Sequence, residues 1–150
     1  MYKLSNRSKE RISGIRPILK VIIEKAISHP KCPDDFGIPQ FGGKRTVQDQ
    51  QFLYSLGRTN FETHNKPVTY VDGVNKKSNH QPKEGEDFGN AFDIYIFCHK
   101  KKRASWNVER LTKLAHHIIK IAAANGVELE WGGSWEKFKD YPHFQFKRFI

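Results

Sequence analysis

The segment Ala91-Phe92-Asp93-Ile94-Tyr95-Ile96-Phe97-Cys98 alternates in character and is rich in aromatic and β-branched residues. This pattern predicts a β-strand. Two small residues, Gly89 and Ala91, precede Asp93 and allow a neighbouring backbone to pack closely there. The segment therefore places a carboxylate at the start of a strand.

Helical patterns lie on both sides of this strand. Apolar residues recur at helical spacing from 108 to 125, where Asn125-Gly126 ends the predicted helix. An earlier helical pattern runs from 5 to 26, but Pro17 lies inside it and predicts either a kink or two short helices. A further helix is predicted from 46 to 57.

The remaining elements are short. Strands are predicted at 36–39, 127–131 and 143–146. Residues 59–89 are polar and are typical of a long functional loop, with a hairpin at 68–74 around the turn signal Asp72-Gly73. Because helices come first and strands follow with one late helix, we predict an α+β fold. Its small antiparallel sheet would be flanked by helices in a single domain that spans residues 1–150.

The chain of 150 residues carries a net charge of +10, which predicts attraction to a polyanion. Its cations are dispersed, and the densest cluster, at 99–103, is short. There is no zinc finger, aromatic RNA-binding motif or basic heptad region. We therefore expect an anionic cell envelope as the partner and no nucleic acid, although the charge alone would suit either.

The sequence shows neither a membrane-spanning segment nor a signal peptide. The chain lacks an apolar run of about 18 residues, so no transmembrane segment is expected. Its polar N-terminus does not look like a signal peptide, which predicts a protein kept in the cytoplasm until something releases it.

Cys32 and Cys98 lie far apart and form no CxxC pair, which favours two free thiols over one disulfide.

Two histidines and two aspartates carry the chemistry. His80 lies on a loop, Asp93 begins a strand and His143 begins another, so an antiparallel sheet can bring them to one face. Asp140 stands three residues before His143, on a turn, where it can lean toward a bound water. Three ligands, an open position and a base are the requirements of a mononuclear zinc hydrolase.

Several segments resemble the zinc D-Ala-D-Ala carboxypeptidase and L-alanyl-D-glutamate peptidase family, whose best-known phage members are cell-wall-cleaving endolysins. Ser78-Asn79-His80 and Gly89-Asn90-Ala91-Phe92-Asp93 are similar to the family motif Ser-x-His-x-x-Gly-x-Ala-x-Asp, and Asp140-Tyr141-Pro142-His143 is similar to its Asp/Glu-x-x-His motif. Further similar blocks are Leu4–Ser8, Gly43–Thr46, Gly57–Thr59 and Trp131–Trp135.

The resemblance implies a role for each motif residue. His80, Asp93 and His143 would be the ligands of one Zn²⁺ ion. Asp140 would act as general base and acid, and Arg45 would hold the scissile carbonyl or its developing oxyanion.

Four more residues are implied in support of these. Ser78 would support the first ligand, and Gln50 would orient the arginine. Trp131 and Trp135 are expected to line the cleft and pack against the substrate.

The loop between His80 and Asp93 is longer than the family motif. Asp87 stands at the motif spacing, whereas Asp93 follows Gly-x-Ala-x and precedes a β-like run, which favours Asp93 as the ligand. The acidic residues of the insert are either a solvated surface loop or a second cation site, for instance for calcium. They are Glu84, Glu86 and Asp87.

The expected protein is thus a monomeric zinc endolysin that hydrolyses peptidoglycan stem peptides at the L-alanyl-D-glutamate bond. It would have no separate cell-wall-binding domain, and it would leave the host cytoplasm to act on periplasmic peptidoglycan. The alternatives are a D-alanyl-D-alanine carboxypeptidase or dipeptidase, a basic nucleic-acid-binding protein, and a non-catalytic zinc-bearing domain of the same fold.

Overall fold

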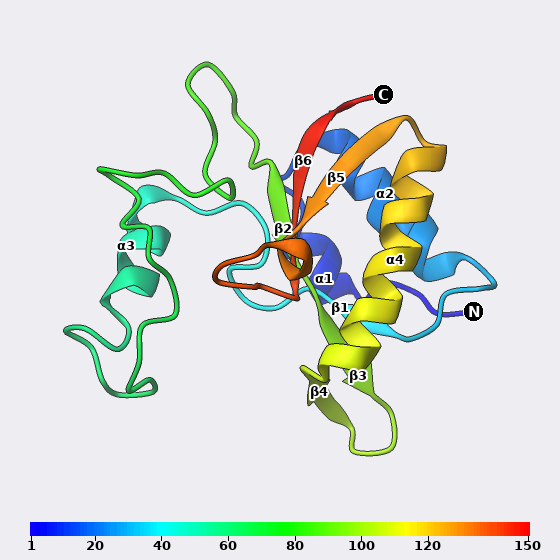
Figure 1. Cartoon of the computed structure of the whole chain (residues 1–150), viewed down its shortest axis with the longest axis horizontal. Coiled ribbons are helices and arrows are strands. Elements are labelled where there is room, and N and C mark those ends of the chain that lie inside the picture. The colour runs from blue at the N-terminus through cyan, green and yellow to red at the C-terminus, as the bar shows by residue number, and fades with distance from the viewer.

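Two antiparallel three-stranded sheets form the centre of the computed structural model, which describes residues 1–150 (Figure 1). One sheet has the order β1 (Phe36–Gly37), β3 (Tyr95–Cys98), β4 (Arg103–Ser105). The other has the order β2 (Ala91–Asp93), β6 (His143–Phe149), β5 (Val127–Trp131). The predicted α+β class is confirmed, with two small sheets in place of one.

The prediction of one continuous strand over 91–98 is wrong. The strand is interrupted at Ile94, whose side chain is fully buried and whose N–H donates to the carbonyl of Pro142 at 3.1 Å. The residues before Ile94 pair with β6, while those after it pair with β1 and β4. Only the choice of partners reveals the break. β4, which is mostly exposed, was also not predicted.

The fold has four α-helices: α1 (Asn6–Arg11), α2 (Pro17–Ser28), α3 (Val47–Ser55) and α4 (Val108–Ala124). Pro17 is the first residue of α2, where its missing N–H costs nothing, so the two-helix alternative is the one observed. Thr46 caps α3 through a reciprocal capping box with Asp49. None of the helices combines the length and the apolar character that crossing a membrane requires.

The hydrophobic core lies between the helices and the sheets. α2 and α4 run side by side, and α4 also packs on β5 (Figure 1). Both helices contribute their predicted apolar stripes, which are buried. The two cysteines are both free.

The segment between α3 and β2 is irregular, so the predicted hairpin at 68–74 is wrong. Asp72 instead forms a turn in which its Oδ1 accepts the backbone N–H groups of Val74, Asn75 and Lys76 at 2.9, 2.8 and 3.2 Å. A side chain that captures three amides competes with strand pairing. The long loop and α3 project together on the side of the molecule opposite α2 and α4 (Figure 1).

Candidate metal centre and active-site cleft

The register of β2 and β6 places two of the predicted ligands on one face. Phe92 pairs with Phe144 and Asp93 with His143. The two phenylalanine rings stack at 5.1 Å between centroids and are fully buried in the core. Because successive residues of a strand point to opposite faces, Asp93 and His143 emerge together on the side away from that core.

His80 reaches the same place from the loop. Gly89 lies against this segment so closely that a Cβ on it would stand 2.5 Å from the carbonyl oxygen of His80. The N–H of Asn90 also donates to the carbonyl of Asn79 at 2.8 Å. The small residue ahead of Asp93 therefore allows the approach that the sequence suggested.

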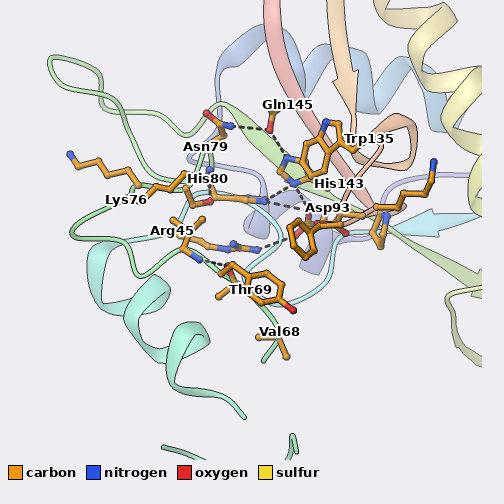
Figure 2. A pocket seen from close by; sticks show the side chains of 18 of the residues that line it. Arg45, Val68, Thr69, Lys76, Asn79, His80, Asp93, Trp135, His143 and Gln145 are labelled. Atoms are coloured by element: carbon orange, nitrogen blue, oxygen red, sulfur yellow. Dashed lines mark hydrogen bonds and ion pairs between the residues drawn. The ribbon is translucent and has the colours of Figure 1, made fainter. Parts of the chain in front are cut away.

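Three side-chain atoms converge at this point (Figure 2). Nε2 of His80 lies 3.3 Å from Oδ1 of Asp93 and 3.3 Å from Nδ1 of His143. Nδ1 of His143 lies 3.1 Å from the same Oδ1. A tetrahedral zinc ion with bonds of about 2.0–2.1 Å separates its ligand atoms by about 3.3–3.4 Å. The triangle has nearly these dimensions.

The outward nitrogens of both imidazoles are engaged by hydrogen bonds. Nδ1 of His80 donates to the carbonyl of Gly43 at 2.8 Å, and Nε2 of His143 donates to Oε1 of Gln145 at 2.7 Å. The inward nitrogens then carry lone pairs and face a carboxylate oxygen. Three electron-pair donors at this separation repel one another unless a cation lies among them, so the donor set fits a metal ion.

The ionisation of the three groups is coupled. Burial lowers the pKa of His80, which favours its neutral form. Burial opposes ionisation of Asp93, but the adjacent imidazoles outweigh it and lower the pKa of its carboxyl. Burial also opposes protonation of His143, and the hydrogen bond to Asp93 outweighs it and raises the pKa of that imidazole.

Arg45 adjoins the centre, just before α3. Its Nη2 donates to Oδ2 of Asp93 at 3.1 Å, so the carboxylate presents its other oxygen to the metal site. Its Nη1 donates to Oε1 of the buried Gln50 at 3.1 Å, and its Nε donates to the carbonyl of Phe41 at 2.8 Å. Of five guanidinium N–H donors, two remain for the cleft. Gln50 holds the arginine and is itself fully buried, so it does not face a substrate.

Asp140 lies at the rim of the same cleft. Its backbone N–H donates to the carbonyl of Gly132 at 3.0 Å, and its carbonyl accepts from the N–H of His143 at 3.2 Å. A Cβ on Gly132 would stand 2.3 Å from the carbonyl oxygen of Asp140, so glycine permits this approach. Although the residue as a whole is exposed, partial burial of the carboxyl and the nearby Asp93 raise the pKa of Asp140.

The two tryptophans have different environments. Trp135 lines the cleft, and its ring lies 5.4 Å from that of His143 (Figure 2). Trp131 is buried in the core, and its Nε1–H donates to the carbonyl of Tyr141 at 2.8 Å. The expectation that Trp131 lines the cleft is therefore wrong: buried positions alternate with partly exposed ones along β5, and Trp131 is one of the buried positions.

Ser78 supports the first histidine, as the sequence suggested, because its Oγ accepts the N–H of His80 at 3.1 Å. The insert that follows has a structural role. Oε1 of Glu86 pairs with Nη2 of Arg16 at 3.4 Å, and Oε2 accepts from Nδ2 of Asn90 at 2.9 Å.

The structure also decides between the two aspartates. Asp87 is exposed, and Asp93 is the carboxylate that joins the two histidines. Glu84 and Asp87 are exposed, whereas Glu86 is partly buried against Arg16 and Asn90, and the three carboxylates do not converge as a group of metal-binding side chains.

The cleft has a volume of about 930 Å³ and runs between the loop 68–79 and the loop 135–140. Tyr70 and Phe138, one from each loop, contact each other with ring centroids 5.1 Å apart. Lysines from both loops join the lining: Lys76, Lys77, Lys137 and Lys139. The cleft thus combines aromatic surface with an excess of positive charge around the acidic centre.

Three polar residues near the centre were missed by the sequence analysis. Gln145, Asn79 and Glu130 are linked by hydrogen bonds beside His143. Gln145 is two residues from His143 in a strand, so it shares a face with that ligand. The two-residue spacing from His143 was the one feature of the sequence that could have predicted the position of Gln145.

Comparison with known proteins matches both the motifs and the fold. A family model described as D-alanyl-D-alanine carboxypeptidase matches residues 72–146, which contain all three converging side chains and Asp140. The chain is 32% identical over 108 residues to the peptidoglycan L-alanyl-D-glutamate endopeptidase CwlK of Bacillus subtilis (strain 168). That match covers 69% of this chain and 56% of CwlK, so the chain spans little more than half the length of that relative.

A solved structure has the same fold. The L-Ala D-Glu endopeptidase ChiX of Serratia marcescens superposes with a TM-score of 0.70 over 96% of this chain and 90% of that one. The two sequences are 23% identical, so this likeness shows the fold alone.

Proposed function

The chain belongs to the D-alanyl-D-alanine carboxypeptidase family of peptidases, and from this premise we propose that it is a zinc-dependent endopeptidase that hydrolyses peptidoglycan stem peptides. The observation that carries the proposal is the convergence of His80, Asp93 and His143 at 3.1–3.3 Å, with their inward lone pairs facing one another. Two imidazoles and one carboxylate form a donor set that suits zinc and leaves a fourth position toward the cleft.

The side chains around the centre supply the rest of the chemistry. When bound, zinc would act as a Lewis acid and make a water molecule more acidic. Asp140 takes the proton of the attacking water and returns it to the leaving amine, a task that suits a carboxyl with a raised pKa. Arg45 fixes Asp93 and directs its remaining N–H groups at the negative charge that develops on the scissile carbonyl. Trp135 packs against the peptide.

We place the cut between L-alanine and D-glutamate. Support comes from CwlK and ChiX, both of which carry that activity in their names. The rival is removal of the terminal D-alanine, which the description of the matching family model names.

We further propose that the protein is a phage endolysin, made in the host cytoplasm and active on periplasmic peptidoglycan after release. The similarity of its motif blocks to phage lysis enzymes supports this setting. The net charge of +10 would help to hold the enzyme near an anionic envelope.

The experiment uses defined muropeptides that carry a complete stem peptide. Metal-free protein, protein loaded with one equivalent of zinc, and loaded Asp140→Asn protein are incubated with them, and mass spectrometry identifies the products. We expect the loaded wild-type protein alone to separate L-alanine from the rest of the stem. Release of free D-alanine without that cut would establish the carboxypeptidase instead, and full activity of the metal-free protein would overturn the zinc proposal.

A further inference from the structure

The side-chain amide of Gln145 connects three segments around the second histidine. Its Oε1 accepts Nε2–H of His143 at 2.7 Å and Nδ2–H of Asn79 at 2.9 Å, and its Nε2 donates to Oε2 of Glu130 (Figure 2 shows the first two contacts). Asn79 is the neighbour of His80 in sequence. Gln145 therefore links β6 to β5 and to the loop that carries the first histidine.

Glu130 decides which way this amide points. An ionised carboxylate can only accept hydrogen bonds, so it must face the NH₂ group of Gln145. Glu130 lies opposite Gln145 in the register of β5 and β6, which holds the two side chains on one face. The amide oxygen is then turned toward His143. If the amide were flipped, its NH₂ group would face the donating Nδ2–H of Asn79, and its oxygen would face the carboxylate of Glu130.

The amide in turn selects the tautomer of His143. An oxygen that accepts at Nε2 requires the hydrogen to be on Nε2, which leaves the lone pair on Nδ1. Nδ1 is the nitrogen that lies 3.1 Å from Asp93 and 3.3 Å from Nε2 of His80. Orientation of this kind by an outer hydrogen bond raises the affinity of a metal site.

We infer that Glu130, acting through Gln145, is a positioning residue that presents Nδ1 of His143 to the metal. The inference rests on the metal centre of the proposed function. It extends that centre from three ligands to an ordered chain that runs from Glu130 through Gln145 to His143, with Asn79 holding the amide from the side of His80.

The decisive variant is Glu130→Gln, which keeps the size of the side chain and removes the obligatory acceptor. Glu128→Gln is the matched control, because Glu128 lies two residues earlier on β5 and pairs with Lys147 and Arg148 instead. Gln145→Leu removes the amide altogether. Zinc dissociation constants are measured by competition with a chromophoric chelator, and the melting temperature of each metal-free variant reports whether it folds.

We expect zinc affinity to fall about tenfold in Glu130→Gln and about 10–100-fold in Gln145→Leu, and to stay within about twofold in Glu128→Gln. Long-range ¹H–¹⁵N NMR of the loaded wild-type protein should show the hydrogen of His143 on Nε2. If Gln145→Leu fails to fold, Glu130→Gln still decides the question.

These measurements distinguish a failure of this inference from a failure of the zinc proposal. Equal zinc affinities of Glu130→Gln and Glu128→Gln, or a hydrogen on Nδ1 of His143, would overturn this inference and leave the zinc proposal intact. A wild-type protein that does not bind zinc would overturn both.

Discussion

Asp140 combines an expected catalytic role with a cost to stability. Partial burial and the neighbouring Asp93 raise the pKa of its carboxyl in the folded protein. The folded state then binds the proton more tightly than the unfolded chain, so stability falls as pH rises through the unfolded value of about 3.9 and on through the folded pKa. At neutral pH the ionised carboxylate is therefore destabilising, and this is the form that the proposed role as general base requires.

Replacing this carboxylate should stabilise the metal-free protein. We expect the melting temperature of Asp140→Asn at pH 7 to exceed that of the wild type. The rise should be about 2–4 °C for each kcal/mol gained in the free energy of unfolding. The difference should shrink as pH falls below about 3.9 and disappear near about pH 2.5, where the carboxyl is protonated in both states. Thermal melts at the two pH values measure this. Asp87→Asn, at an exposed position outside the cleft, is the control and should show little change.

The same substitution should abolish most of the activity. With zinc bound, Asp140→Asn should lower kcat by about 10²–10⁴-fold, because proton transfer loses its base. Zinc affinity should stay near the wild-type value, since Asp140 is not among the converging ligands. Rates on muropeptides and chelator competition provide the two measurements. Glu136→Gln, an exposed neighbour on the same loop, should leave both unchanged; retention of full activity by Asp140→Asn would mean that another group is the base.

The loops that form the cleft walls are ordered by local contacts and not by a sheet. Asp72 holds the turn 72–76 through three backbone amides, and these contacts lower the pKa of its carboxyl to about 2. Because the folded pKa lies below the unfolded value, the turn is stabilised above about pH 4 and loses this contribution as pH falls toward 2. Tyr70 and Phe138 then join this wall to the opposite loop.

Removing the Asp72 carboxylate should loosen one wall of the cleft. We expect Asp72→Ala to speed amide hydrogen exchange at Val74 and Lys76 and to raise KM for a stem peptide several-fold, with little change in zinc affinity. Asp72→Asn keeps one acceptor oxygen and should lie between the variant and wild type. Exchange rates unchanged in Asp72→Ala would show that packing, not this turn, orders the wall.

Charge acts over the molecule as a whole. The net +10 is dispersed, yet four lysines gather at the cleft, so the face that carries the cleft attracts polyanions. Attraction to an extended anionic surface sums over many distant charges and is screened by salt, whereas contacts inside the cleft are screened less.

Salt should therefore separate envelope binding from hydrolysis. As ionic strength rises from about 0.01 M to 1 M, the Debye length shrinks from about 30 to 3 Å. We expect hydrolysis of purified sacculi to slow several-fold over this range, and hydrolysis of a short soluble stem peptide to change much less. Parallel rate measurements on the two substrates test this. A sacculus rate that does not weaken with salt would contradict the role of charge.

The helices and the three converging side chains were predictable from the sequence because their signals are local. Helical periodicity, a proline at the start of α2 and a capping residue at Thr46 act within a few residues. The motifs around His80, Asp93 and His143 likewise carry their small neighbours with them, although the roles of these residues remain predictions. Pairing was not predictable in this way. The break at Ile94 and the burial of Trp131 depend on partners distant in the chain.

The sequence by itself thus determined the family, the α+β class and the residues able to bind a metal, since residue type and short spacing encode these. Only the tertiary structure decided that Asp93, and not Asp87, lies with the two histidines, and that Arg45 donates a hydrogen bond to the carboxylate of Asp93. It also decided that Trp135, and not Trp131, lines the cleft. It also revealed Gln145 and Glu130 behind His143. The physical reason is that strand register and close backbone approach at glycine set distances between segments as far apart in sequence as Phe36 and Ile96, and no local pattern records those distances.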